Sequence, residues 1–325
     1  NITHAPGMEH VREMVTGPII PTPGAVMECT KLLYEYLGDL IVLDVGGATT
    51  DLHSVTVESD QVARLMISPE PKAKRTVEGD LGVYVNRWKV VESIGEEKLR
   101  EQCREQGFSM EHALETYRAI PKTEEEVKLV ELLTREAVVK AAERHAGRLR
   151  YIYGPSGRST VAEGKDLTQV KYIVGTGGAL TRLPHREEIM REITRCNESG
   201  MLLLPGEHAQ ILVDHDYIMA SLGVLSKRYP QAAARLLEQS LGITFPERKA
   251  EEPVPVCNKE LSRLETQRQQ REEELQRHIE ECEAMGYDMS AYRENRPKAG
   301  DCSHECSRCT RLHCPNRTTQ EGASS

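Results

Sequence analysis

One segment of the sequence, residues 44–51, combines two carboxylates, two glycines and two threonines, as Asp-Val-Gly-Gly-Ala-Thr-Thr-Asp. Glycines let a backbone approach a ligand closely and turn its N–H groups toward it, which suits a phosphate. Asp44, at the mouth of this turn, can reach a water bound to Mg2+, a cation that prefers carboxylates and retained waters. The segment therefore predicts a phosphate site in which Asp44 has a catalytic role, positioning Mg2+ or water. The predicted phosphate contacts are Gly46, Gly47, Ala48, Thr49 and Thr50. A plain hairpin with a tight glycine turn is the alternative.

A second glycine-rich turn lies in residues 173–184, IVGTGGALTRLP. Three glycines ahead of a predicted helix leave room for a flat ligand and expose backbone amides. The spacing is not that of a dinucleotide-binding motif, because the last glycine of G-x-G-x-x-G is missing. The small residues of this turn are Gly175, Gly177, Gly178 and Ala179.

Near its C-terminal end the chain holds four cysteines in the pattern C-x3-C-x2-C-x4-C, at Cys302, Cys306, Cys309 and Cys314. The first three have the spacing of the cluster-binding cysteines of radical SAM enzymes, but those follow an early barrel strand and not a charged helix. A four-thiolate site suits an iron–sulfur cluster or a structural Zn2+, and thiolate softness does not separate the two. A tail without metal is the third alternative.

The elements that position these residues alternate between strand and helix, which predicts an α/β fold. We expect a helix over 24–37, then strands over 40–45, 52–57 and 61–68. Residues 96–148 have a strongly helical pattern, and 151–164 are expected to form a loop. A buried strand over 169–174 leads into the second turn and a helix over 179–192. A strand over 210–213 precedes two helices that split near Pro230.

Composition excludes several classes of protein. The 325 residues carry 42 Lys plus Arg against 51 Asp plus Glu, a net charge of -9, with 4% aromatic residues. An acidic chain without a basic block and with few stacking side chains does not suit nucleic acid. No apolar run reaches the roughly 18 residues of a membrane span, and no signal peptide is evident. Because five cysteines are scattered singly, we expect reduced thiols and a cytoplasmic protein.

At this point the sequence resembles a known superfamily. DVGGATTD is similar to the second phosphate loop of the actin, sugar-kinase and Hsp70 superfamily, and GTGGALTRLP resembles its adenosine loop. A closer likeness is to the accessory protein family of glutamate mutase, a MutL-type family unrelated to mismatch repair. That likeness is carried by PTPGAVMECTKLL, GDLIVLDVGGATTDLHSVTVES, KRTVEGDLGVYVN, IVGTGGALTRLPH and PGEHAQILVDHDYIMASLGVLSKRYPQAA. These segments cover most of residues 1–244.

The resemblance implies an ATP-dependent, chaperone-like reactivating factor for an adenosylcobalamin-dependent mutase, either glutamate (methylaspartate) mutase or a related aminomutase. It implies ATP and Mg2+ as cofactors, phosphate and Mg2+ at 44–50, and adenosine at the second turn. Residues 1–244 would be the second lobe of an actin-like (ribonuclease H-like) ATPase, with a helical insertion at about 94–150. A linker over 245–257, a charged helix over 258–298 and a Cys-rich metal-binding tail over 299–325 would follow.

One departure from the superfamily pattern concerns the first lobe, which should begin with its own phosphate loop. Nothing before Asp44 supplies that loop, and the chain opens on Asn1, so we expect that an N-terminal lobe is missing. ATPase activity is then expected only from the two-lobed protein, since hydrolysis needs groups on both sides of the γ-phosphate. A small-molecule kinase of the same superfamily and a non-enzymatic metal-binding interaction module are the alternative functions. The charged helix could also self-associate as a coiled coil.

Overall fold

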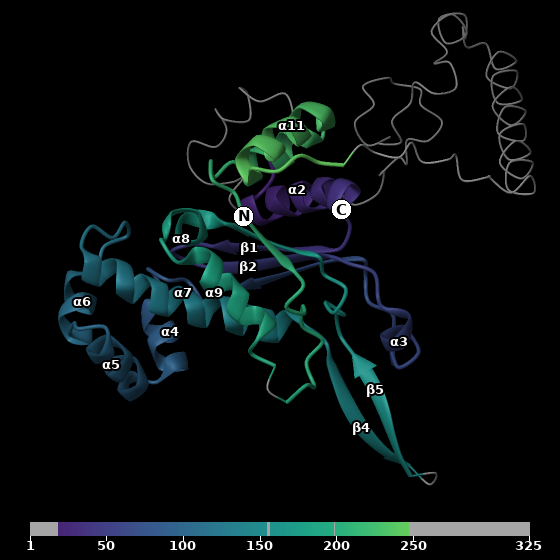
Figure 1. Cartoon of the computed structure of the whole chain (residues 1–325), viewed down its shortest axis with the longest axis horizontal. Coiled ribbons are helices and arrows are strands. Elements are labelled where there is room, and N and C mark those ends of the chain that lie inside the picture. Colours follow the sequence, from purple (N-terminus) through teal and green to yellow (C-terminus); the bar gives the residue numbers. More distant parts are fainter. Residues whose placement is uncertain (1–18, 155–156, 198, 247–325) are drawn as a thin grey trace, which may run out of the picture. The chain divides into compact units, whose positions relative to one another are not determined.

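The computed structural model describes residues 19–154, 157–197 and 199–246 (Figure 1). These residues belong to one compact unit that ends at Arg248. The predicted charged helix, the four clustered cysteines and most of the predicted linker lie outside the described residues.

The centre of the unit is a mixed five-stranded sheet with the strand order β3-β2-β1-β6-β7. The strands are β1 (Leu40–Val45), β2 (Thr50–Val55), β3 (Ala73–Glu78), β6 (Tyr172–Thr176) and β7 (Gln210–Val213). Strand β2 is antiparallel to both β1 and β3, whereas β1, β6 and β7 are parallel. The central strand β1 is nearly all apolar because helices cover it on both faces.

Three helices cover one face of the sheet: α2 (Thr22–Leu37), α10 (Met219–Ser226) and α11 (Pro230–Leu241). Their apolar side chains pack with Leu40, Val42 and Val174, which alternate with residues that point to the other face. Helices α2 and α10 approach closely, since a Cβ on Gly223 would lie 1.8 Å from the carbonyl oxygen of Ala25. A larger residue at this position would push the two helices apart.

The opposite face carries most of the other described helices and the larger part of the core, which includes Ile41, Leu43 and Val45 of β1. Its longest helix begins with a capping box, in which Thr123 and Glu126 bond each other's backbone N–H. The helices are α4 (Arg87–Ile94), α5 (Glu96–Glu105), α6 (Met110–Thr116), α7 (Glu124–His145), α8 (Gly177–Arg182), α9 (Arg186–Arg191) and the 3-10 helix η2 (Glu192–Thr194). The structure is therefore a three-layered α/β fold.

Three sequence predictions about these elements were wrong in type or extent. The expected strand over 61–68 is replaced by the short helix α3 (Asp60–Ala63), because the Ser59 hydroxyl caps it by accepting the N–H of Val62. The third strand is instead β3. The expected loop over 151–164 is a hairpin of β4 (Arg148–Gly154) and β5 (Gly157–Glu163). The helix expected over 179–192 is divided into α8 and α9, with Pro184 between them.

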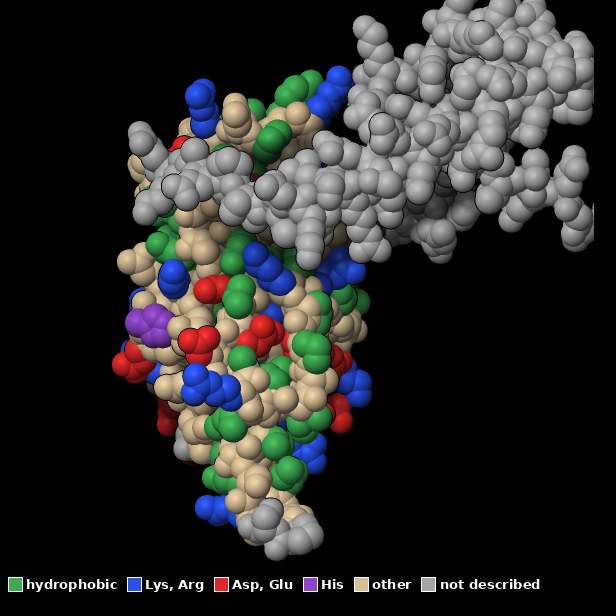
Figure 2. All heavy atoms as spheres, turned by 90° about the vertical axis from the view of Figure 1, so that its right-hand side faces the viewer, with side chains coloured by type: hydrophobic (Ala, Val, Ile, Leu, Met, Phe, Trp, Pro, Cys, Tyr) green, Lys and Arg blue, Asp and Glu red, His purple; other side chains and the backbone are tan. Residues whose placement is uncertain are grey.

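The β4–β5 hairpin carries apolar side chains on its surface. Tyr151, Ile152 and Tyr153 are all exposed. Figure 2 shows hydrophobic side chains at the lower end of that view, where the hairpin lies.

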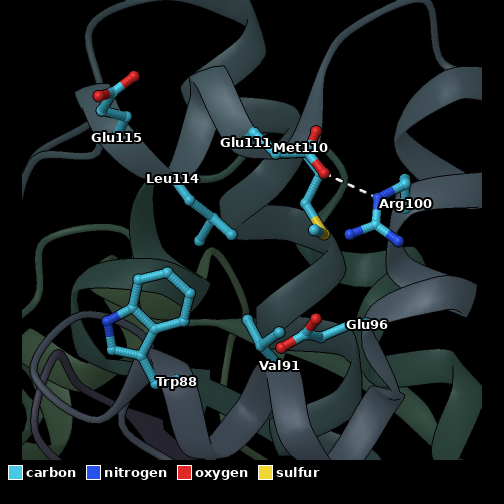
Figure 3. Close-up of a pocket in the computed structure, with 8 residues that line it drawn as sticks. All are labelled: Trp88, Val91, Glu96, Arg100, Met110, Glu111, Leu114 and Glu115. Carbon is cyan, nitrogen blue, oxygen red and sulfur yellow. Dashed lines mark hydrogen bonds and ion pairs between the residues drawn. The ribbon is translucent and has the colours of Figure 1, made fainter.

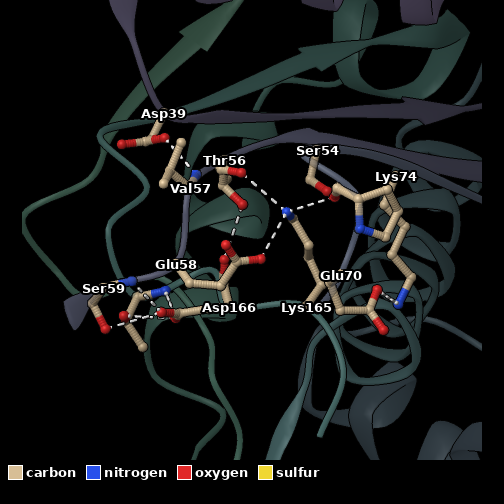
Figure 4. Close-up of polar contacts among 12 residues, drawn as sticks. Asp39, Ser54, Thr56, Val57, Glu58, Ser59, Glu70, Lys74, Lys165 and Asp166 are labelled. Atoms are coloured by element: carbon tan, nitrogen blue, oxygen red, sulfur yellow. Dashed lines mark hydrogen bonds and ion pairs between the residues drawn. The ribbon is translucent and has the colours of Figure 1, made fainter. Parts of the chain in front are cut away.

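A buried lysine joins the end of β2 to the segments around it (Figure 4). Lys165 is fully buried, and its ammonium group donates to the carbonyl oxygens of Thr56, at 3.0 Å, and Pro71, at 2.9 Å. Burial lowers the pKa of Lys165, while the Glu58 carboxylate, 3.8 Å away, favours the charged form. Beside it, Asp166 accepts hydrogen bonds from the backbone and hydroxyl of Ser59. These contacts fix the chain between β2 and β3.

Within the described part of the chain, we find no helix with the length and apolar character needed to cross a membrane.

Candidate functional site

The two glycine turns of the sequence meet at one edge of the sheet. Strands β1, β6 and β7 are parallel, so their carboxyl ends lie side by side. Asp44 is paired in register with Thr176 of β6 and with Asp51 of β2. A Cβ added to Gly177 would lie 2.5 Å from the Oδ1 atom of Asp44. The backbone after β6 therefore contacts the carboxylate at the end of β1.

The segment that follows β3 fixes the β1–β2 turn through hydrogen bonds. The carbonyl of Gly47 accepts hydrogen bonds from the N–H groups of Tyr84 and Val85, at 2.9 and 2.7 Å. The Asn86 side chain donates to the carbonyls of Ala48, at 2.8 Å, and Gly79, at 2.7 Å. These hydrogen bonds hold the turn by its carbonyl oxygens, and they leave Gly47 and Ala48 exposed on the surface.

The threonines of this turn have different positions. Thr50 is fully buried, and its hydroxyl donates to the carbonyl of Leu81 at 2.7 Å. This hydroxyl therefore positions the turn from inside. Thr49 is only partly buried, and its backbone carbonyl accepts the N–H of Gly46 at 2.9 Å.

The glycines of the second turn serve different purposes. Gly175 belongs to β6, where a Cβ would lie 2.6 Å from the sulfur of Met190. Gly177 has φ +84°, a left-handed conformation that favours glycine. Gly178 is exposed, and a Cβ there would meet nothing within 4 Å. Ala179, by contrast, is buried. The open space of this turn therefore lies at Gly178.

Two carboxylates at this edge, Asp44 and Asp51, have pKa values well above the usual range. Burial and the carboxylates of Asp51 and Asp214 raise the pKa of Asp44 to about 6. Burial also raises the pKa of Asp51 to about 6, although a hydrogen bond from Thr49 and the charge of Arg75 oppose this shift. Among the described residues, none donates a hydrogen bond to the Oδ1 atom of Asp51. The chemistry of this pair suits a cation, which would neutralise the carboxylates.

A third carboxylate, Asp214, follows β7 and was missed by the sequence analysis. It is fully buried, and its Oδ2 atom accepts hydrogen bonds from the Thr176 hydroxyl, at 2.8 Å, and the Met219 N–H, at 3.0 Å. Its Oδ1 atom accepts the Ser240 hydroxyl at 2.6 Å and the Ile218 N–H at 3.2 Å. Asp214 therefore ties the end of β6 to the start of α10 and adds negative charge behind Asp44.

Tyr217, in the same loop, was also missed. It has φ 55°, a left-handed conformation that is uncommon for a tyrosine. Its side chain is 54% exposed. Burial and the charges of Asp44 and Asp214 raise the pKa of its hydroxyl. A carboxylate or aromatic residue directly after a short apolar strand is the only sequence signal that could have indicated this loop.

Comparison with known proteins supports the resemblance seen in the sequence. A family model described as "MutL protein" matches residues 1–241. The chain belongs to the MutL protein family. "Protein MutL" of Clostridium tetanomorphum is 34% identical over 252 residues, which cover 74% of this chain and 54% of that relative. The chain thus spans about half the length of the relative. Both glycine turns and all three carboxylates lie within the matched range.

Proposed function

We propose that the chain forms one nucleotide-binding lobe of an ATP-dependent, chaperone-like accessory protein that reactivates an adenosylcobalamin-dependent mutase. The observation that carries the proposal is the contact of Gly177 with the Asp44 carboxylate, which brings the two glycine turns together. The turn after β1 then suits the phosphates and the turn after β6 suits the adenosine of one nucleotide. Membership of the MutL family supports glutamate mutase or a related mutase as the partner.

The topology of the sheet supports an actin-like lobe. A five-stranded order with β2 antiparallel to its neighbours and helices on both faces is the arrangement expected of the ribonuclease H-like fold. Helices α4 to α7 lie between β3 and β6 in the chain, where the helical insertion of such a lobe is expected. In α/β sheets, ligands bind beyond the carboxyl ends of the strands, which is where both turns lie.

The side chains at this edge fit ATP with Mg2+. Mg2+ is commonly held by one or two carboxylates together with phosphate oxygens and waters. Asp44 and Asp51 supply carboxylates, and the described residues contain no group of three or more His, Cys, Asp or Glu that could hold a metal without such help. In our proposal, Asp44 orients a water of the cation and the backbone of 46–49 contacts phosphate. Gly178 leaves room for the adenosine.

A nucleotide bound here would supply an anhydride bond, and its hydrolysis would shift the conformational equilibrium of the protein. Because the chain spans 54% of its relative, we propose that a second lobe completes the cleft and that hydrolysis requires it. In our proposal, the described residues would bind and orient the nucleotide, and closure of the two lobes would change the affinity for the mutase.

Three further elements of the proposal are a metal site, a charged helix and a cytoplasmic location. We propose that Cys302, Cys306, Cys309 and Cys314 bind an iron–sulfur cluster or Zn2+. We propose that residues 258–298 form a charged helix that self-associates or binds a partner. We also propose a cytoplasmic protein, which is supported by the free state of the described cysteines Cys29, Cys103 and Cys196.

A reactivation assay tests the proposed function. Mutase inactivated with hydroxocobalamin is incubated with the full-length protein, Mg2+–ATP and fresh adenosylcobalamin, and recovery of mutase activity is followed. We expect recovery with the wild type and its loss with Asp44→Ala. Asp60→Ala, which removes an exposed carboxylate on α3, is the matched control and should retain activity. Recovery that needs no nucleotide, or that survives Asp44→Ala, contradicts the proposal.

A further inference from the structure

A pocket of about 380 Å³ lies among the three short helices α4, α5 and α6 (Figure 3). Its apolar wall includes Val91, Met110 and Leu114, which are all buried in the core beneath it. We call this feature the Trp88 groove, because Trp88 of α4 forms one side of it. The volume lies within the range of sites that take a small ligand or a few side chains.

Trp88 is the single tryptophan of the chain, and its residue surface is 55% exposed. The neighbouring residues Val90 and Val91 are buried, so α4 is firmly packed while its indole faces the groove. A tryptophan buries more area in a complex than most other side chains do, and it is among the residues that most often dominate binding energies. An exposed indole beside an apolar wall is therefore suited to anchor the apolar side chain of a partner.

The charges around the groove are predominantly negative. It is lined by Glu96, Glu111, Glu115 and one cation, Arg100. The guanidinium of Arg100 is already engaged, since it donates to Glu111 at 2.7 Å and to Glu97 at 2.9 Å. Among the residues that the structure describes, Glu96 and Glu115 have no such partner. Two free carboxylates therefore remain at the rim of an apolar surface.

We infer that the Trp88 groove is a docking site for a short segment of the mutase that presents a large apolar side chain next to a lysine or arginine. The apolar side chain would pack on Trp88, Met110 and Leu114, and the cation would pair with Glu96 or Glu115. Complementary charges across an interface chiefly set specificity and association rate, whereas the buried aromatic contact chiefly sets affinity. The inference rests on the proposed function, because it takes the mutase as the partner.

Binding of the purified mutase to the full-length protein, measured by biolayer interferometry, tests the inference. We expect Trp88→Ala to raise the dissociation constant by 10-fold or more, as for a central aromatic anchor. Glu96→Gln with Glu115→Gln should weaken binding mainly at low salt and reduce its dependence on ionic strength, since screening already weakens such pairs at high salt.

Matched controls separate the groove from general surface effects. Ile120 is also apolar, lies outside the groove and is 75% exposed, more than Trp88, so the variant Ile120→Ala should bind as the wild type does. Glu101→Gln with Glu125→Gln changes the same charge on α5 and α7, away from the groove lining. An unchanged far-ultraviolet circular dichroism spectrum and melting temperature establish that each variant is folded.

The outcomes distinguish this inference from the proposed function. Wild-type protein that does not bind the mutase overturns the proposed partner and the inference with it. Binding that Trp88→Ala leaves within twofold of wild type overturns the groove as the docking site and leaves the proposed function standing. Equal losses in the groove variants and in the controls also overturn it.

Discussion

The carboxylate of Asp44 makes the unliganded protein less stable than it would otherwise be. Its pKa is raised from 3.8 to about 6, so at pH 8 the folded state holds a charge that burial, Asp51 and Asp214 oppose. This shift corresponds to about 3 kcal/mol, which partial exposure of the side chain reduces to about 1–2 kcal/mol. Asp44→Asn removes the charge, so we expect the free energy of unfolding at pH 8 to rise by that amount. The melting temperature should increase by roughly 3–6 °C.

The pH dependence gives this prediction its sign. The folded state binds the Asp44 proton more tightly than the unfolded state does, so the penalty is complete above pH 6 and is relieved as the pH falls toward 3.8. The advantage of Asp44→Asn should therefore disappear near pH 4 when melting is followed by circular dichroism. Asp80→Asn is the control of opposite sign, because Arg144 lowers the pKa of Asp80 and the variant loses that pair. A variant Asp44→Asn that is less stable than wild type at pH 8, or equally stabilised at pH 4, refutes the reasoning.

Three other predictions concern single positions, each measured by thermal or urea unfolding of the purified chain. Gly177→Ala should destabilise by about 2 kcal/mol or more, because φ is +84° and a Cβ would lie 2.5 Å from the β1 backbone, whereas Gly178→Ala should match wild type. Lys165→Met should lower the free energy of unfolding by about 2–4 kcal/mol, because two buried carbonyls lose their hydrogen-bond donor. Lys98→Met, at an exposed lysine, should lower it little. Equal effects of the two substitutions contradict the role of the buried ammonium group. Burial lowers the pKa of His145 from 6.5 to about 3, so below pH 6.5 this residue should lower the free energy of unfolding of the wild type, by about 2 kcal/mol at pH 5. The variant His145→Gln should therefore lose less stability than the wild type between pH 7 and pH 5. An equal loss of stability in the two proteins contradicts this role of His145.

Parts of the fold that depend on local pattern could be predicted from the sequence. The run Leu40–Val45 is short, apolar except for Asp44 and stopped by two glycines, and it forms the predicted strand. The helix before it and the two helices split near Pro230 were predicted for similar reasons. Family membership was predictable because the motifs are specific over most of 1–244, and the comparison confirmed it.

Features that depend on contacts between distant segments could not be predicted. Asp214 follows a four-residue strand, and its role depends on hydrogen bonds from Thr176 and Ser240, which lie far from it in the sequence. The hydroxyl of Thr50 is adjacent to that of Thr49 in sequence, yet only the fold shows that it points to Leu81. The mistaken strand over 61–68 has a local cause: the spacing of its apolar residues is compatible with a strand, but the Ser59 side chain caps a short helix at its start.

The central claim is that one nucleotide binds across the two glycine turns with Asp44 beside its Mg2+. The most direct measurement is the melting temperature of the full-length protein with and without Mg2+–ATP, for the wild type, Asp44→Ala and Gly178→Val. A ligand that binds only the folded state stabilises it by about 2.7 kcal/mol at 100 times its dissociation constant. We predict that Mg2+–ATP raises the melting temperature of the wild type, that excess EDTA reduces this increase, and that each variant loses most of it. A wild-type melting temperature that Mg2+–ATP leaves unchanged, or an equal increase in all three proteins, would contradict the account.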